Sequence, residues 1–297
     1  MTTPTVEAHD EMTELDEARH KTTTIAGERE LRYAEYGDPN GSPVVFLHGT
    51  PGSSRLAALF DSTAGQSGVR LLAPDRPGFG ESSPWPERSV QDAARFVTPV
   101  LDDAGVDTAG LVAFSGGSPY ALATATTVPD RITRVDVVAG ATPPTIDDET
   151  PAVQRLLTGL ATTTPTILRG LFRGQSWLAG RLDPSFVTAQ YTAEGNDDSI
   201  SQETGEVVKQ DFVEAFSQSR RGAVTEFRHT ATDWAIAYAD IDAEVTFWHG
   251  ENDTNVPIAG ARRLASAIPT AELHTIDDAD HLGTLLQSMP EVLNTYR

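Results

Sequence analysis

The chain has 297 residues and 39% hydrophobic residues, which suits a sheet domain with one insertion. Its formal net charge of −21 argues against a nucleic-acid partner, because nucleic-acid binding requires a basic surface. The sequence contains no cysteine, which excludes disulfides and thiolate chemistry, and no closely spaced histidine pair suggests a metal site. We therefore expect neither a metal nor a cofactor.

The first 20 residues are polar and acidic and lack the apolar segment of a secretory signal. No stretch of the chain approaches the roughly 18 apolar residues that a membrane span requires. We expect residues 1–20 to form a flexible acidic tail and the protein to be cytoplasmic, without a membrane span.

Arginine dominates the basic residues, since Lys21 and Lys209 are the only lysines among 22 basic residues facing 43 acidic ones. A surface of this kind favours a halophilic host, in which concentrated salt screens the repulsion between carboxylates. The alternative interpretation is that the excess of acidic residues only keeps the protein soluble.

Strand and helix patterns alternate through the first half of the chain. A hairpin is predicted from strands at 22–25 and 30–35, with Ala26-Gly27-Glu28 forming the turn between them. Further strands are predicted near 43–47, 70–74, 109–114 and 134–139, and helices near 89–104 and 119–127. This alternation predicts a mostly parallel sheet.

Two of these strands run into glycine-rich loops. The strand at 43–47 is followed by His48-Gly49-Thr50, and the strand at 70–74 is followed by the loop 75–82. The second loop contains Gly78-Phe79-Gly80, but Ser83 stands where a dinucleotide-binding motif has its third glycine. We interpret that loop as architectural.

The strand at 109–114 ends on Ser115, which is followed by Gly116 and Gly117. A serine on a sharp strand-to-helix turn requires small residues two positions before and two positions after it. Ala113 and Gly117 occupy those positions, although the usual pattern has glycine at both. The segment therefore predicts an exposed nucleophile.

The alternation stops after residue 141 for about ninety residues, in which 153–160, 165–182 and 206–218 show helical spacing. We predict a helical cap at 144–235 inserted into a core formed by 21–143 and 236–297. Phe172 and Trp177 in the cap, together with Phe114, are candidate acyl-pocket residues, and the alternative for the cap aromatics is a packed helix face.

The strand pattern resumes at 244–249 and leads to Asp253, and a last strand at 273–276 leads to His281. Both residues follow the carboxyl end of a predicted parallel strand, where open α/β sheets bind their ligands. Asp253 is the candidate acid and His281 the candidate base.

Four motifs occur along the chain: the loop His48-Gly49-Thr50, the turn at Ser115, and the strand-to-loop segments that lead to Asp253 and to His281. Together with the order Ser115, Asp253, His281 along the chain, they resemble the serine-nucleophile, esterase-like branch of the α/β-hydrolase-fold superfamily with a helical cap. The resemblance implies an α/β fold in which helices flank a mostly parallel sheet. It also implies a catalytic triad of these three residues and an oxyanion hole formed by the backbone N–H groups of Thr50 and Gly116.

The expected function is hydrolysis of a small-molecule acyl substrate, most simply a carboxylic ester, through an acyl-enzyme on Ser115. Ser115 argues against haloalkane dehalogenases and epoxide hydrolases, which carry aspartate there, and Thr50 and Phe114 depart from the proline iminopeptidase pattern. The open alternatives are an aminopeptidase, a carbon–carbon hydrolase, a cofactor-free perhydrolase and a ligand receptor without turnover. The sequence does not predict an oligomeric state.

Overall fold

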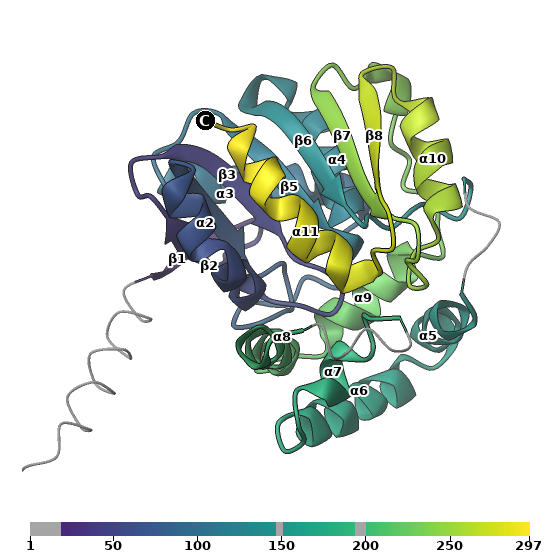
Figure 1. Cartoon of the computed structure of the whole chain (residues 1–297). Coiled ribbons are helices and arrows are strands. Elements are labelled where there is room, and N and C mark those ends of the chain that lie inside the picture. The colour runs from purple at the N-terminus through teal and green to yellow at the C-terminus, as the bar shows by residue number, and fades with distance from the viewer. Residues whose placement is uncertain (1–18, 147–150, 194–199) are drawn as a thin grey trace, which may run out of the picture.

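The computed structural model describes residues 19–146, 151–193 and 200–297 (Figure 1). Its centre is an eight-stranded sheet in the order β1-β2-β4-β3-β5-β6-β7-β8. The strands are β1 (His20–Ile25), β2 (Arg29–Gly37), β3 (Ser42–Leu47), β4 (Val69–Pro74), β5 (Ala109–Phe114), β6 (Ile132–Val138), β7 (Glu244–Gly250) and β8 (Ala271–Ile276).

The sheet is mostly parallel, as the alternation predicts. β2 pairs antiparallel with both β1 and β4, and every other pairing is parallel. All six residues of β5 are buried, because helices cover both faces of the central strands. The predicted α/β fold class is confirmed.

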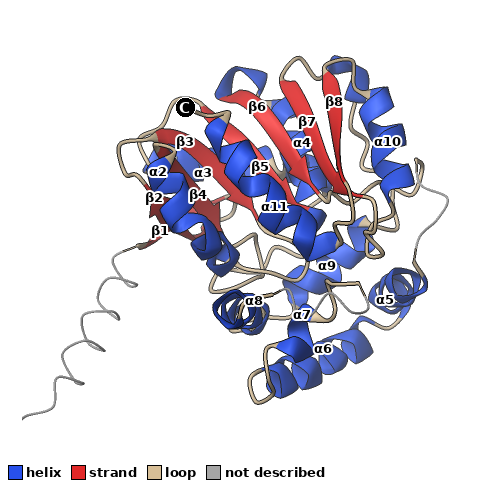
Figure 2. Ribbon diagram, viewed as in Figure 1, coloured by secondary structure: helices blue, strands red, loops and turns tan. Residues whose placement is uncertain are grey.

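Helices form a layer on each face of the sheet (Figure 2). α2 (Asp61–Gln66) and α11 (His281–Asn294) pack into one hydrophobic cluster. α3 (Ala94–Asp103), α4 (Ser118–Thr127) and α10 (Ile258–Ala267) pack into a second cluster on the opposite face. None of the helices in the described ranges is long and apolar enough to cross a membrane.

The helix predicted at 89–104 is divided. Ser89 and Asp92 form a capping box around a 3₁₀ turn, Val90–Asp92, and the α-helix begins only at Ala94. The predicted acidic tail at 1–20 lies almost wholly outside the described residues, and β1 already includes His20.

A group of helices lies between β6 and β7 in the sequence and covers one end of the sheet (Figure 1). These are α5 (Ala152–Thr163), α6 (Pro165–Ala179), α7 (Ser185–Thr188), α8 (Gln202–Glu214) and α9 (Arg221–His229). α8 begins earlier than the predicted 206, because the Ser201 side chain accepts from the Thr204 N–H and caps the helix there. We call these helices the cap; its boundaries at 144 and 235 stay a prediction.

A buried carboxyl group joins α8 to the core. Asp211 accepts hydrogen bonds from the N–H (2.7 Å) and the hydroxyl (2.9 Å) of Ser53, which precedes a 3₁₀ segment, Ser54–Phe60. Burial, helped by the nearby carboxylates of Glu214 and Asp75, raises the pKa of Asp211 to about 8, although the Ser53 hydrogen bonds act to lower it. Asp211 therefore holds a proton at neutral pH when the protein is folded.

This proton makes stability depend on pH. The unfolded chain releases this proton near the ordinary pKa of 3.8. The contribution of Asp211 to the stability of the fold is therefore complete below that pH and is lost as pH rises through about 8. Asp211→Asn keeps the acceptor oxygen and carries no charge at any pH. We expect the variant to melt at least about 4 °C above the wild type at pH 9 and to lose most of that advantage at pH 5.

The matched control is Asp183→Asn at an exposed position, where the melting temperature should change little at either pH. A difference between Asp211→Asn and the wild type that stays constant from pH 5 to pH 9 would contradict the assignment.

Candidate active site

Ser115 lies directly after β5, at the start of the turn that leads into α4. Its φ of 51° is in the left-handed region, which a non-glycine residue adopts only when the surrounding structure enforces it. A Cβ at Gly117 would come within 2.4 Å of the Leu47 carbonyl oxygen, and one at Gly116 would come within 2.2 Å of Thr50 Oγ1. Both glycines are thus required for the chain to turn so close to β3.

The two other predicted triad residues contact each other. His281 Nδ1 lies 2.7 Å from Asp253 Oδ2, and both side chains are buried. The other carboxylate oxygen accepts the N–H groups of Asn255 and Val256, each at 2.9 Å. Burial alone would raise the pKa of Asp253, but His281 and these hydrogen bonds lower it overall. An ionised Asp253 orients His281 with Nδ1 as donor, which leaves Nε2 free to accept a proton.

Aromatic rings enclose His281 on two sides. The Phe114 ring lies with its centroid 4.9 Å from that of His281, and the Tyr191 ring stacks at 6.3 Å. The Tyr191 carbonyl also accepts the Leu282 N–H at 2.9 Å. The Phe114 ring therefore packs against the imidazole of His281. Phe114 does not line the cavity described below.

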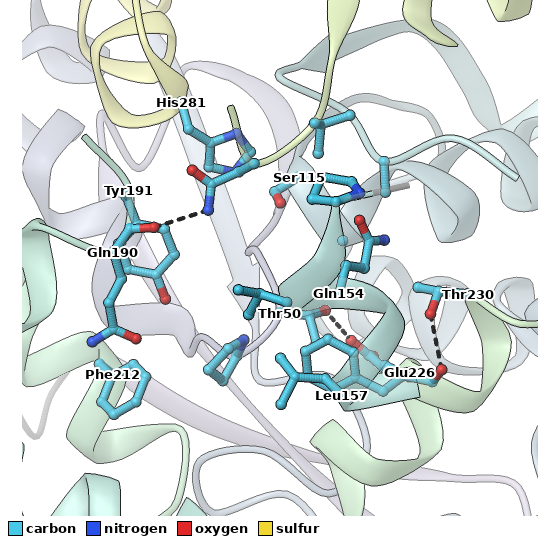
Figure 3. A pocket seen from close by; sticks show the side chains of 18 of the residues that line it. Thr50, Ser115, Gln154, Leu157, Gln190, Tyr191, Phe212, Glu226, Thr230 and His281 are labelled. Atoms are coloured by element: carbon cyan, nitrogen blue, oxygen red, sulfur yellow. Dashed lines mark hydrogen bonds between the residues drawn. The ribbon is translucent and has the colours of Figure 1, made fainter. Parts of the chain in front are cut away.

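Ser115 and His281 line a cavity of about 510 Å³ between the cap and the sheet (Figure 3). Its apolar wall comes mostly from the cap and includes Leu157, Phe172, Tyr191, Phe212, Phe227 and Trp234. Polar uncharged side chains are interspersed, among them Gln154, Gln175, Gln190, Thr230 and Asn255. The cavity is suited to a mainly apolar small molecule.

The two cap aromatics predicted for the pocket occupy opposite faces of α6. Phe172 is buried, lines the cavity and stacks against Phe216 and Phe227 with centroids 5.1 and 5.9 Å away. Trp177 is 57% exposed and does not line the cavity. The two positions are five residues apart along the sequence, which places their side chains on different faces of the helix.

A buried carboxylate from the cap lies at the same cavity. Glu226 on α9 accepts the Thr50 hydroxyl, shown by a dashed line in Figure 3. Arg76 donates to both of its oxygens, from Nε at 2.9 Å and Nη2 at 2.7 Å, and Arg88 donates at 2.8 Å. Burial would raise the pKa of Glu226, but the arginines lower it to about 2. Glu226 is therefore ionised, and the cluster of three charges has one net positive charge.

Arg76 extends this cluster to the loop after β3. Its guanidinium donates to the carbonyl oxygens of His48 and Gly49, and to Thr50 Oγ1 at 3.0 Å. The loop 75–82, interpreted from the sequence as architectural, thus holds the chain on either side of Gly49. The sequence analysis missed Glu226, Arg76 and Arg88, because nothing in the local pattern distinguishes Glu226 from the other acidic residues.

A partly buried pair, Tyr120 and His229, lies beside the cluster. Tyr120 Oη is 2.7 Å from His229 Nδ1, and His229 Nε2 is 2.9 Å from the Arg88 carbonyl oxygen. Burial, helped by the charge of Arg88, lowers the pKa of His229 to about 4. His229 is thus neutral at neutral pH. Within the described residues, no group of three or more His, Asp or Glu side chains is arranged to hold a metal ion.

Removing the Glu226 charge should cost far more stability than removing an exposed one. Glu226→Gln leaves two buried guanidiniums without a counter-charge, so we expect a loss of about 3–5 kcal/mol and a melting temperature about 10 °C lower at pH 7. The contribution is present above the ordinary pKa of 4.5 and is lost as pH falls toward 2. The difference from the wild type should therefore shrink below pH 4.5.

The matched control is Glu214→Gln, which breaks a partly exposed pair with Arg55 at 3.2 Å. That change should cost about 1 kcal/mol or less. Equal melting temperatures for the two variants would contradict a structural role for the Glu226 cluster.

Comparisons with known proteins agree with this architecture. Residues 42–286 match the family described as alpha/beta hydrolase fold. The uncharacterized hydrolase YcgS of Bacillus subtilis is 30% identical over 113 residues, which is 38% of each protein, so this match spans well under half of that relative. A 2-hydroxy-6-oxononadienedioate/2-hydroxy-6-oxononatrienedioate hydrolase of Paraburkholderia phymatum is 26% identical over 284 residues, 92% of each.

A crystal structure of a bromoperoxidase from Bacillus anthracis superposes with a TM-score of 0.72 at 19% identity, covering 93% of this chain and 99% of that one. This likeness concerns the fold. Because the family match spans most of the chain, and the sheet order and flanking helices agree with it, the protein belongs to the alpha/beta hydrolase fold family.

Proposed function

We propose that the protein is a serine hydrolase that cleaves carboxylic esters with neutral acyl groups. The observation that carries the proposal is that Ser115, in a strained turn, and His281, which is hydrogen-bonded to Asp253, line one cavity. Strain of this kind is found where a turn presents a nucleophile.

In the proposed reaction Ser115 Oγ attacks the ester carbonyl carbon while His281 Nε2 accepts the hydroxyl proton. The proton then passes to the leaving alcohol as the carbon–oxygen bond breaks, which leaves an acyl group on Ser115. Water attacks the acyl-enzyme with His281 again as base, and the acid leaves. Asp253 stabilises the imidazolium at each stage.

The N–H groups of Thr50 and Gly116 would stabilise the oxyanion formed in each half-reaction. The close approach of Gly116 to Thr50 supports this assignment, since a Cβ on Gly116 would lie only 3.2 Å from the Thr50 nitrogen. The Glu226 cluster adds a net positive charge beside Thr50, and that charge favours a developing negative charge nearby.

Covalent labelling tests the nucleophile. We expect one fluorophosphonate adduct on the wild type by intact-mass analysis, and no adduct on Ser115→Ala. Ser118→Ala, which changes another serine of the same turn, is the control and should be labelled like the wild type. Labelling is measured in dilute buffer and in molar potassium chloride.

An adduct that persists in Ser115→Ala would place the reactive serine elsewhere. The absence of an adduct in both salts would favour the ligand-receptor alternative over any serine hydrolase.

Charge at the cavity supports a neutral acyl group. No Lys or Arg is among the described residues that line it, His229 is neutral, and the guanidiniums of Arg76 and Arg88 lie outside this lining and are hydrogen-bonded to Glu226. Residues 147–150 and 194–199 also contain no Lys or Arg in their sequence. The name of the Paraburkholderia relative specifies a dicarboxylate substrate, and a second carboxylate would find no basic side chain here. This observation argues against the alternative that the protein is a carbon–carbon hydrolase acting on dicarboxylates.

Matched substrates test this selectivity. We expect kcat/KM for a nitrophenyl ester of a neutral medium-length acid to exceed that for the ester of the corresponding half-acid by about 10- to 100-fold. The reason is that the half-acid places an unpaired carboxylate in the cavity. Equal values for the two substrates would contradict a neutral pocket, and turnover of an unsaturated keto-diacid with none of any ester would favour carbon–carbon cleavage.

A further inference from the structure

The outer face of the cap exposes large apolar side chains. Leu171 and Trp177 on α6 are 53% and 57% exposed, although most leucine and tryptophan side chains in the described chain are buried. The large hydrophobic residues classed as exposed in the described chain all lie on α5, on α6 or just after α6: Val153, Leu156, Ile167, Leu171, Trp177, Leu178 and Leu182. In Figure 1, α6 lies on the side of the cap farthest from the sheet.

The positions on α6 and just after it form two adjacent stripes. Ile167, Leu171 and Leu178 follow one another at intervals of four and seven residues, which aligns them along one side of the helix, and Leu182 follows four residues later, after the helix ends. Arg173, Trp177 and Arg181 follow the neighbouring line at intervals of four, and the Arg181 guanidinium lies 4.1 Å from the Trp177 ring centroid. Apolar and cationic side chains thus share one exposed surface.

The charge of this surface is opposite to that of the chain. Residues 151–182 contain four arginines and no acidic residue, whereas the whole protein has a formal net charge of −21. Acidic residues resume on both sides, at Glu149 and Asp183. We define the α5–α6 patch as the seven apolar residues above together with Arg155, Arg169, Arg173 and Arg181.

The patch adjoins the entrance to the cavity. Val153 is 69% exposed and also lines the cavity that contains Ser115. Gln154, the next residue, and Leu157, one turn further along α5, line the same cavity. A ligand bound to the patch would therefore lie beside the opening of the candidate active site.

We propose that the α5–α6 patch binds an anionic lipid surface. Exposed Leu and Trp side chains can enter the boundary between headgroups and acyl chains while arginines pair with anionic headgroups. A second copy of the chain, bound symmetrically through the same patch, would place arginines against arginines and is disfavoured by their repulsion. The patch thus matches a partner that is both apolar and negatively charged.

The acidic remainder of the protein does not prevent this contact. At physiological ionic strength, charges separated by more than about 8 Å are largely screened, so distant carboxylates act weakly on a membrane that the patch touches. In Figure 1 the sheet and its flanking helices extend away from α6. The contact would orient the protein with the cavity entrance toward the lipid.

Vesicle flotation at physiological salt tests the proposal. We expect the full chain to bind vesicles of phosphatidylcholine with about one third phosphatidylglycerol, and to bind pure phosphatidylcholine at least about tenfold more weakly. The double variant Arg173→Gln/Arg181→Gln should weaken binding to the anionic vesicles about 25-fold, since each arginine near such a surface contributes roughly fivefold. Trp177→Ala should weaken binding to the same vesicles.

The matched control is Arg262→Gln on α10, an exposed arginine outside the patch, which should bind anionic vesicles like the wild type. Melting temperatures of all variants establish that they are folded. Equal binding to both kinds of vesicle, no binding to either, or unchanged binding by the patch variants would overturn the proposal. A dimer that Trp177→Ala dissociates, without lipid binding, would assign the patch to a second copy. Because no turnover is measured, these results are independent of the proposed esterase function.

Discussion

The ion-pair cluster centred on Glu226 joins the cap to the core at the candidate active site. One carboxylate from α9 meets two guanidiniums from the segment after β4 and the hydroxyl of Thr50 from the loop after β3. A buried carboxylate of this kind is tolerated only when its oxygens are hydrogen-bonded and its charge is opposed, and both conditions are met. The cap can therefore occupy its position only while the loop 48–50 occupies its own, so the geometry near Ser115 depends on how the cap sits.

A second interaction joins the cap to the residues on the other side of the cavity. The Tyr191 carbonyl accepts the Leu282 N–H, and Asn255 donates its side-chain N–H to the Gln190 carbonyl at 2.9 Å. These contacts reach the segments that carry His281 and Asp253. The cap is thus fixed both at the proposed oxyanion loop and at the proposed acid–base pair, so its apolar wall has a defined position relative to Ser115.

The difference between what could and could not be predicted follows from sequence distance. The turn at Ser115 is specified by its immediate neighbours, and Asp253 and His281 follow strands whose apolar runs are easily recognised, so the sheet and these candidate positions were accessible from sequence. Glu226 acquires its role from Arg76 and Arg88, which lie 150 and 138 residues away. Phe114 was expected at the pocket, yet a strand directs successive side chains to opposite faces, and the Phe114 ring packs against His281. Helical spacing alone could not show that the face of α6 with Phe172 packs inward and that the face with Trp177 is exposed to solvent.

The distribution of charge separates three environments within one acidic protein. Buried carboxyl groups are accommodated in different ways: Asp211 is protonated, Glu226 is opposed by two arginines, and Asp253 pairs with His281. The described residues that line the cavity are uncharged apart from His281, which pairs with Asp253, and Glu226, which pairs with two arginines, so the cavity can desolvate an uncharged acyl group without leaving a charge unpaired. The α5–α6 patch reverses the sign of the surface next to the cavity entrance. Under the two proposals, an apolar acyl substrate would be concentrated where the patch meets lipid, would enter beside Val153, and would then lie among the aromatic side chains of the cavity next to Ser115.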